Sequence, residues 1–267
     1  MILPKLKLDD IELYYKVYGK RAPLLLISGL GSDVSSWMNV VNKLSAHFKV
    51  IVFDNRGAGR SEISNRSYTV RQMAGDAIRL LDYLKIKKAH IMGHSMGGYI
   101  AQELAINYPE RVDKLILEST ASISSKRNNR LFLDFYKELK RGGNLEAWIR
   151  RWTRWLFSKK CFTHKRFIET FVKNGANYPY AQQVSGFKGQ IDAIASFGTR
   201  KRLSRIKAKT LVMEGEEDML ILPREAKRLA RNISGSIYQS VKDTAHCMHI
   251  ESPDLFVKAA IKFLISK

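Results

Sequence analysis

The chain has 267 residues, a hydrophobic fraction of 45%, two cysteines and a formal net charge of +21. This length and composition suit one large α/β domain with an insertion, able to bury a sizeable core without disulfides. The positive charge is not accompanied by zinc-finger spacing or an aromatic RNA-recognition motif, so we expect no nucleic acid partner.

The compartment is predicted from two further features. The N-terminal residues show no apolar signal segment, and the longest apolar runs have the length of strands, so we expect no stable membrane insertion. Two cysteines without metal-site spacing suit a reducing compartment. We therefore expect a cytoplasmic protein.

The first 120 residues alternate between strand and helix patterns. Lys5–Leu8 and Ile11–Tyr18 are predicted to pair as antiparallel strands. The apolar runs that follow are of the buried, parallel kind, and helices with one apolar face separate them. These predicted strands are Leu24–Ser28, Val50–Phe53, Ala89–Met92 and Val112–Leu117. The alternation predicts a mostly parallel sheet that is covered by helices on both faces.

The alternation stops after about residue 121 and resumes after residue 205. The intervening segment is predicted to be helical, with Asn144 and Thr163 capping the second and third of its helices, which are Leu131–Leu139, Leu145–Phe157, Lys165–Lys173 and Tyr180–Ala195. The last part of the chain returns to strands at Thr210–Met213 and Ile237–Val241 and helices at Arg224–Ala230 and Leu255–Ile265. We predict a core domain of residues 1–121 and 206–267 with a helical cap inserted at residues 122–205.

A sharp turn is predicted at Gly93-His94-Ser95-Met96-Gly97, because a strand passes directly into a helix there. Such a turn brings the residues two before and two after the serine very close together, so both must be small. The pattern predicts that Ser95 is an exposed nucleophile, with the N–H of Met96 available to a developing oxyanion. The alternative is a glycine-rich strand–helix turn with an inert serine.

A nucleophilic serine needs a base, and the base needs an orienting carboxylate. After the predicted strand Thr210–Met213, three acidic residues beyond Gly215 are candidates for this carboxylate, namely Glu216, Glu217 and Asp218. His246 follows the last predicted strand. Both positions lie at the carboxyl ends of strands, the edge at which an open α/β sheet binds ligands.

With these motifs the chain resembles the α/β-hydrolase superfamily over essentially its whole length. The closest likeness is to small cap-bearing carboxylesterases, of the enol-lactonase and pimeloyl-carrier-protein methyl ester esterase type. That superfamily uses the order serine, acid, histidine. The resemblance assigns Ser95 as the nucleophile, Asp218 in Gly-x-x-Asp as the acid and His246 as the base. It places the second oxyanion donor at the N–H of Leu30.

The resemblance implies a serine hydrolase that cleaves carboxylic esters through an acyl-enzyme. Thioesterases, lactonases and C–C bond hydrolases share this triad, and a non-catalytic hydrolase-like binding protein is the alternative from another class. No cofactor is expected, because Gly57-x-Gly59 lacks the third glycine of a dinucleotide-binding motif. No metal is expected, because His246-x-x-His249 lacks the spacing of a zinc hydrolase.

The predicted cap is strongly basic, since residues 126–166 hold 13 lysine and arginine residues against three acidic ones, a local net charge of +10. The helix Leu145–Phe157 has an apolar face that includes Trp152 and Trp155, with its arginines on other faces. One interpretation is a packing stripe with a solvated basic face. The other is an acyl pocket, with Trp152 and Trp155 binding a small-molecule ester beneath a basic rim.

The resemblance also implies a partner for that rim. Methyl-ester esterases of biotin synthesis, which the chain resembles in size and architecture, use a basic cap on an acidic acyl-carrier protein. An anionic lipid surface is the rival partner.

Overall fold

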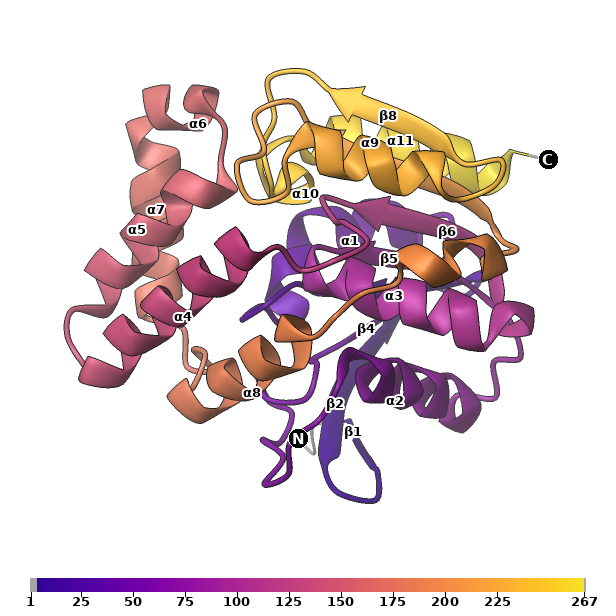
Figure 1. The fold of residues 1–267 in the computed structure, drawn as a ribbon, viewed down its shortest axis with the longest axis horizontal. Helices are drawn as coiled ribbons and strands as arrows, with labels where there is room; N and C mark the ends of the chain where they lie inside the picture. Colours follow the sequence, from indigo (N-terminus) through magenta and orange to yellow (C-terminus); the bar gives the residue numbers. More distant parts are fainter. Residues whose placement is uncertain (1–3, 267) are drawn as a thin grey trace.

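A single eight-stranded sheet organises the protein, whose computed structural model describes residues 4–266 (Figure 1). The strand order is β1-β2-β4-β3-β5-β6-β7-β8. The pairs β1/β2 and β2/β4 are antiparallel, and every other neighbouring pair is parallel. The strands are β1 (Lys5–Lys7), β2 (Glu12–Tyr18), β3 (Pro23–Ile27), β4 (Lys49–Phe53), β5 (Ala89–His94), β6 (Val112–Glu118), β7 (Lys209–Gly215) and β8 (Ile237–Val241).

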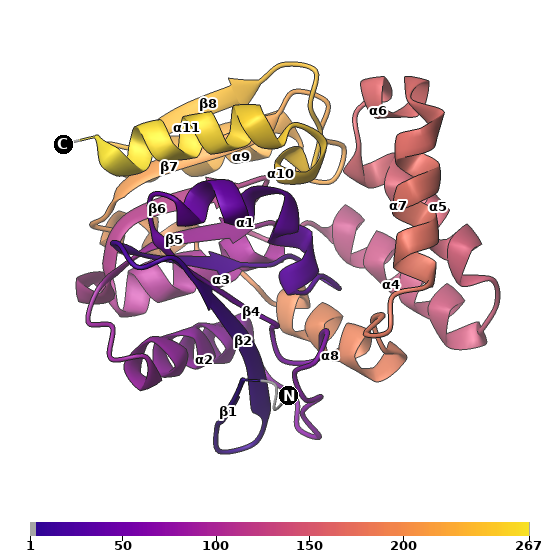
Figure 2. The ribbon, with the colours of Figure 1, turned by 180° about the vertical axis from the view of Figure 1, so that it is seen from behind.

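Helices cover both faces of this sheet, which confirms the predicted fold class. Alternate residues of a strand point to opposite faces, so Leu25 and Ile27 of β3 enter one core while Leu24 and Leu26 enter another. The first core packs against α2, α3 and α9, which lie in front in Figure 1; the second packs against α1 and α11, which lie in front in Figure 2. These helices are α1 (Met38–Ser45), α2 (Val70–Tyr83), α3 (Met96–Asn107), α9 (Pro223–Arg231) and α11 (Pro253–Ile265), with a short α10 (Met248–Glu251) before the last.

Between β6 and β7 the chain forms a helical insertion, defined here as residues 126–195, that lies beside the carboxyl ends of the parallel strands (Figures 1 and 2). Its helices are α4 (Lys126–Arg141), α5 (Leu145–Leu156), α6 (Lys159–Thr163), α7 (Lys165–Ala176) and α8 (Val184–Ala195). The insertion falls within the predicted cap, residues 122–205. The cap boundaries themselves stay a prediction.

Several predicted helix boundaries in the insertion are wrong. Helix α4 begins five residues before the predicted start, because Ser125 caps it by accepting from the N–H of Asn128. Thr163 is not a cap of α7; it ends α6, a helix that was not predicted. Helix α8 begins at Val184, and Tyr180 instead lies over the guanidinium of Arg60 at 3.9 Å.

The N-caps of α5 and α2 follow their sequence signals. Asn144 accepts from the N–H of Ala147, as predicted. Thr69 and Gln72 form a reciprocal capping box at the start of α2. Within residues 4–266, no helix combines the length and the apolar character needed to cross a membrane.

Candidate active site

Ser95 sits at the junction of β5 and α3 in a strained backbone conformation, with φ 54° and ψ −116°. A non-glycine residue with this φ is held there only when its surroundings force it. Gly93 and Gly97 explain how the turn closes: a Cβ on Gly93 would lie 2.2 Å from the Gly97 carbonyl oxygen, and a Cβ on Gly97 would lie 2.0 Å from the Ile27 carbonyl oxygen. The predicted sharp turn is therefore present, and both glycines are required by close approach.

Neighbouring strands fix the backbone on each side of Ser95. Its N–H donates to the carbonyl of Glu118 on β6 at 2.9 Å, and its carbonyl accepts from the hydroxyl of Thr120 at 2.9 Å. The residue itself is half-buried. The turn thus holds the serine at the carboxyl edge of the sheet without burying it.

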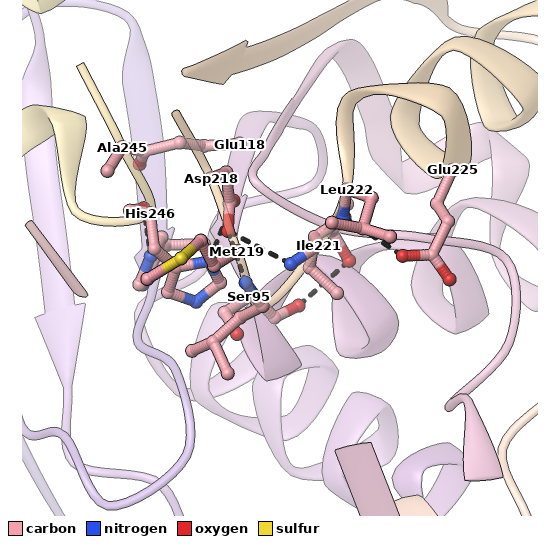
Figure 3. A network of polar contacts seen from close by, with 12 residues as sticks. Ser95, Glu118, Asp218, Met219, Ile221, Leu222, Glu225, Ala245 and His246 are labelled. Carbon is pink, nitrogen blue, oxygen red and sulfur yellow. Dashed lines mark hydrogen bonds and ion pairs between the residues drawn. The ribbon is translucent and has the colours of Figure 1, made fainter. Parts of the chain in front are cut away.

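Asp218 and His246 are in contact, and both side chains are buried (Figure 3). The Asp218 Oδ2 atom lies 2.9 Å from His246 Nδ1, and Oδ1 accepts the N–H groups of Leu220 at 2.8 Å and Ile221 at 2.9 Å. Because a carboxylate accepts, Nδ1 carries the proton, which leaves Nε2 as the basic nitrogen of the imidazole. This is the tautomer that a general base for a serine requires.

The loop that carries His246 is attached to the serine turn through His94. The Nε2 atom of His94 donates to the His246 carbonyl at 3.0 Å, and the two rings lie 4.9 Å apart. Since His94 directly precedes Ser95, this contact holds the loop of His246, called the base loop after its predicted role, against the turn of Ser95, called the nucleophile turn. Figure 3 shows Ser95 near the Asp218–His246 pair; among the described residues, the hydrogen bond within this group of three is the one between His246 and Asp218.

The two predicted oxyanion donors are unengaged: within residues 4–266, neither the N–H of Leu30 nor that of Met96 donates to another group of the chain. The loop around Leu30 is fixed on both sides, because Asn55 donates to the Ser28 carbonyl at 2.9 Å and the N–H of Gly31 donates to Gln190 Oε1 at 2.9 Å. The loop around Leu30 is called the oxyanion loop after its predicted role. Because the loop is held in place and the N–H of Leu30 is free, this N–H is suited to donate to a developing negative charge.

Trp152 is buried in an aromatic cluster inside the helical insertion. Its ring stacks on Phe135 at 3.9 Å and lies 5.9 Å from Phe132. Phe187 of α8 is 6.4 Å from Trp152, and it also borders Gly31, where an added Cβ would lie 3.4 Å from its ring. The aromatic cluster therefore extends to the oxyanion loop. The indole N–H of Trp152 has no partner among the described residues, and Trp155 is half-buried against the same core.

Two carboxylates near the base were not assigned roles by the sequence. Glu251 accepts from the N–H of Ala245, next to His246, and from the hydroxyl of Ser158 at 2.8 Å and the thiol of Cys161 at 3.1 Å, both in the insertion. It therefore ties the base loop to the helical insertion. Burial raises the pKa of the Cys161 thiol to about 12, which makes it a poor nucleophile.

The second carboxylate, Glu118, lies in a buried group with His94 and His249. Glu118 Oε1 accepts from His249 Nδ1 at 2.8 Å and from its backbone N–H at 3.2 Å. Burial raises the pKa of Glu118 to about 7 and lowers the pKa of His249 to about 3, so both groups resist carrying charge. The signal for Glu118 was its place at the carboxyl end of a predicted strand.

The donor atoms of this group lie within 4.8 Å of one another, close enough to be considered as a metal site. A zinc ion would need its ligand atoms about 2.0–2.2 Å from one centre. Here His94 Nε2 donates to a backbone carbonyl and His249 Nδ1 donates to the carboxylate. The arrangement is that of a hydrogen-bonded network.

A parallel sheet with a serine at a strained strand–helix turn, followed along the chain by an acid and a histidine, defines a class of α/β hydrolases. Residues 22–253 match the sequence model of the alpha/beta hydrolase fold, so the chain belongs to that family. The resemblance inferred from the motifs is thereby confirmed.

The names of individual relatives give different activities. The chain is 30% identical over 258 residues to the protein named "Putative carbamate hydrolase RutD" of Azorhizobium caulinodans, covering 95% of each chain. It is similar to the enol-lactonase of Burkholderia xenovorans LB400 (27% identity, TM-score 0.89, 98% of this chain and 100% of that one). It is also similar to a thermophilic esterase of Thermogutta terrifontis (26% identity, TM-score 0.87, 98% of each chain). A carbamate hydrolase was not among the expected relatives.

Proposed function

We propose that this hydrolase cleaves carboxylic esters through an acyl-enzyme, with Ser95 as the nucleophile, His246 as the base and Asp218 as the orienting acid. The observation that supports this most strongly is the Asp218–His246 contact, held by His94 against a strained serine turn. A buried carboxylate on Nδ1 fixes the imidazole with Nε2 as the proton acceptor.

The chemistry follows from these positions. Ser95 Oγ attacks the ester carbonyl carbon while His246 Nε2 takes the hydroxyl proton, and the oxyanion accepts hydrogen bonds from Leu30 and Met96. The tetrahedral intermediate collapses, and the departing alkoxide takes the proton from His246. A water molecule then attacks the acyl-enzyme with His246 again as base, which releases the acid and restores Ser95.

Two other substrate classes have specific support. Carbamates are suggested by the name of the relative from Azorhizobium caulinodans, and lactones by the enol-lactonase. Both present a carbonyl that the same serine can attack, so the triad alone does not separate them. Thioesters and C–C substrates are the remaining alternatives.

The substrate pocket that we propose lies beneath the helical insertion, with Trp152 and Trp155 on its wall. The unpartnered indole N–H of Trp152 and the contact of Phe187 with the oxyanion loop support this placement. A methyl ester on an acidic acyl-carrier protein is the proposed form of a larger substrate, docked on the basic face of α5.

That docking face is smaller than the sequence suggested. Arg150 pairs with Glu169 at 2.7 Å and Arg151 pairs with Glu138 at 2.7 Å, so both arginines are engaged within the insertion. Arg154 is exposed and has no ion-pair partner among residues 4–266. We therefore assign the docking role to Arg154 and the exposed lysines of α6.

The proposal is tested by a hydrolysis screen over p-nitrophenyl esters of increasing acyl length, with lactones, thioesters and carbamates beside them. On the best substrate, Ser95→Ala and His246→Ala should each lower kcat by several orders of magnitude, because removing one member disables the unit. Glu216→Gln is the matched control, since this exposed carboxylate lies two residues before Asp218. Full turnover by Ser95→Ala would contradict the mechanism, and the substrate with the highest kcat/KM decides the class.

A further inference from the structure

Glu118 contacts two segments that carry the proposed triad, the nucleophile turn of Ser95 and the base loop of His246. Its backbone carbonyl accepts the N–H of Ser95 at 2.9 Å, and in the β5–β6 pairing it stands opposite His94. Its side chain accepts two hydrogen bonds from His249, which lies three residues after His246. Figure 3 shows Glu118 close to the Asp218–His246 pair.

His249 is held in place by aromatic neighbours as well as by Glu118. Trp37 lies against its ring at 4.5 Å, and the His94 ring meets it at 4.6 Å. His94 in turn donates to the His246 carbonyl. The base loop is therefore fastened at two points, at His246 by His94 and at His249 by Glu118, and both fastening residues sit beside the nucleophile.

The Glu118–His249 contact leaves two buried polar atoms unpaired. Glu118 and His249 are fully buried, and Glu118 Oε2 and His249 Nε2 have no partner among the described residues. An unpaired buried polar atom destabilises the fold, and an apolar pair of similar shape would avoid that loss. The charged and titratable groups that face Glu118 are His94 from β5, Asp218 after β7, and His246, Cys247 and His249 from the base loop.

We propose that Glu118 is a positioning residue for the base: through His249 it holds the His246 loop in register with Ser95. This inference rests on the proposed triad. It adds a buried acid, distinct from Asp218, that acts on the base without touching the substrate.

Glu118→Ala and Glu118→Gln test the hydrogen bond at this residue, because alanine removes the acceptor for the His249 N–H whereas the amide keeps an oxygen there. We expect Glu118→Ala to lower kcat on p-nitrophenyl acetate about tenfold with KM nearly unchanged, since a positioning defect acts on the reacting geometry more than on binding. Glu118→Gln should retain most of kcat. A purely structural role would not lower kcat while leaving KM unchanged.

The other side of the Glu118–His249 hydrogen bond is tested by substitution of His249. Asn at this position can place an amide N–H where Nδ1 now donates, so His249→Asn should retain most of kcat. His249→Ala loses the donor and should lower kcat by about 10²-fold, the scale of a displacement of about 1 Å in an active site. Thermal unfolding of every variant separates loss of positioning from loss of folded protein.

Glu214→Ala is the matched control. Glu214 is a buried carboxylate near the end of the adjacent strand β7, but it accepts its hydrogen bonds from Tyr238 and Ser240 on β8. The inference is overturned if Glu118→Ala keeps the wild-type kcat, or if Glu214→Ala lowers kcat equally with KM unchanged. It is also overturned if His249→Asn and His249→Ala lose the same activity. If Ser95→Ala retained turnover, the proposed triad itself would be contradicted. This result distinguishes a failure of the triad from a failure of the role proposed for Glu118.

Discussion

Asp218 is one of three neighbouring acidic residues, and the loop geometry separates their tasks. The Asp218 side chain turns inward to His246, whereas Glu217 accepts the backbone N–H of Lys159 at 2.9 Å and Glu216 is exposed. Glu217 thus links the acid loop to the helical insertion. Of the three, only Asp218 contacts His246, which is the position that the proposed mechanism requires of the acid.

We expect Asp218→Asn to lower kcat by roughly 10⁴-fold, because an amide favours the wrong imidazole tautomer while leaving the fold intact. Glu217→Gln, which removes a neighbouring charge at the same side-chain length, should change kcat less than tenfold. Steady-state kinetics on the best ester from the screen provides the measurement. A comparable loss in the two variants would mean that the acid has been assigned wrongly.

Residues differ in how far their sequence context reveals their role. Ser95 could be recognised because glycines stand two residues before it and two residues after it, where the turn leaves no room for a Cβ. The strand pattern marks the place of Glu118, but its pairing could not be recognised, because His249 is 131 residues distant and no local pattern indicates the pair. Local geometry was therefore predictable, and long-range side-chain pairing was not.

At the scale of elements, helix α5 packs into the helical insertion through its apolar face. Its apolar face was predicted with two interpretations, and the stack of Trp152 on Phe135 supports packing for at least that residue. The same stack lies next to the oxyanion loop through Phe187, so packing and substrate contact are compatible.

Trp152→Ala should therefore lower the free energy of unfolding by about 3–5 kcal/mol, the usual cost of truncating a buried aromatic residue. Trp155→Ala, at a half-buried position, should cost less. Urea unfolding measures both. If Trp152 also lines the pocket, the variant should shift the preferred acyl length upward; an unchanged unfolding free energy would contradict the packing role.

Elements of the sheet could be predicted more closely than those of the insertion. Strands such as β3 and β4 are buried on both faces, so their apolar runs mark them directly. In the insertion, tertiary contacts override local signals. Tyr178 donates to Asp33 at 2.6 Å and Tyr180 covers Arg60, and these contacts with the core hold the chain out of a helix until Val184.

On the scale of the whole molecule, the helical insertion is joined to both loops of the proposed triad. Arg127 at the start of α4 donates to the Met219 carbonyl at 2.6 Å and to the Leu220 carbonyl at 2.7 Å, just after Asp218. Glu251 joins Ser158 to the loop of His246. The insertion is thus connected by hydrogen bonds to the loops that carry Asp218 and His246.

The net charge of +21 makes association with an acidic partner sensitive to salt. We expect Arg154→Glu combined with Lys160→Glu to lower kcat/KM on an ester bound to an acyl-carrier protein, with a loss that shrinks at high salt, and to leave p-nitrophenyl acetate unaffected. Arg200→Glu with Lys201→Glu removes the same charge from an exposed site outside residues 126–166 and serves as control. If both double variants lowered kcat/KM equally, the overall charge of the protein would explain the loss, and the proposed docking face would be contradicted.

The central claim is that Ser95 becomes acylated during turnover, and covalent labelling tests it most directly. After reaction with a fluorophosphonate, peptide mapping by mass spectrometry should find one adduct, on Ser95, with hydrolytic activity lost in proportion to labelling. His246→Ala should label far more slowly, because its serine lacks a base. Continued ester hydrolysis by an enzyme that carries no adduct, or an adduct on a different residue, would contradict the account.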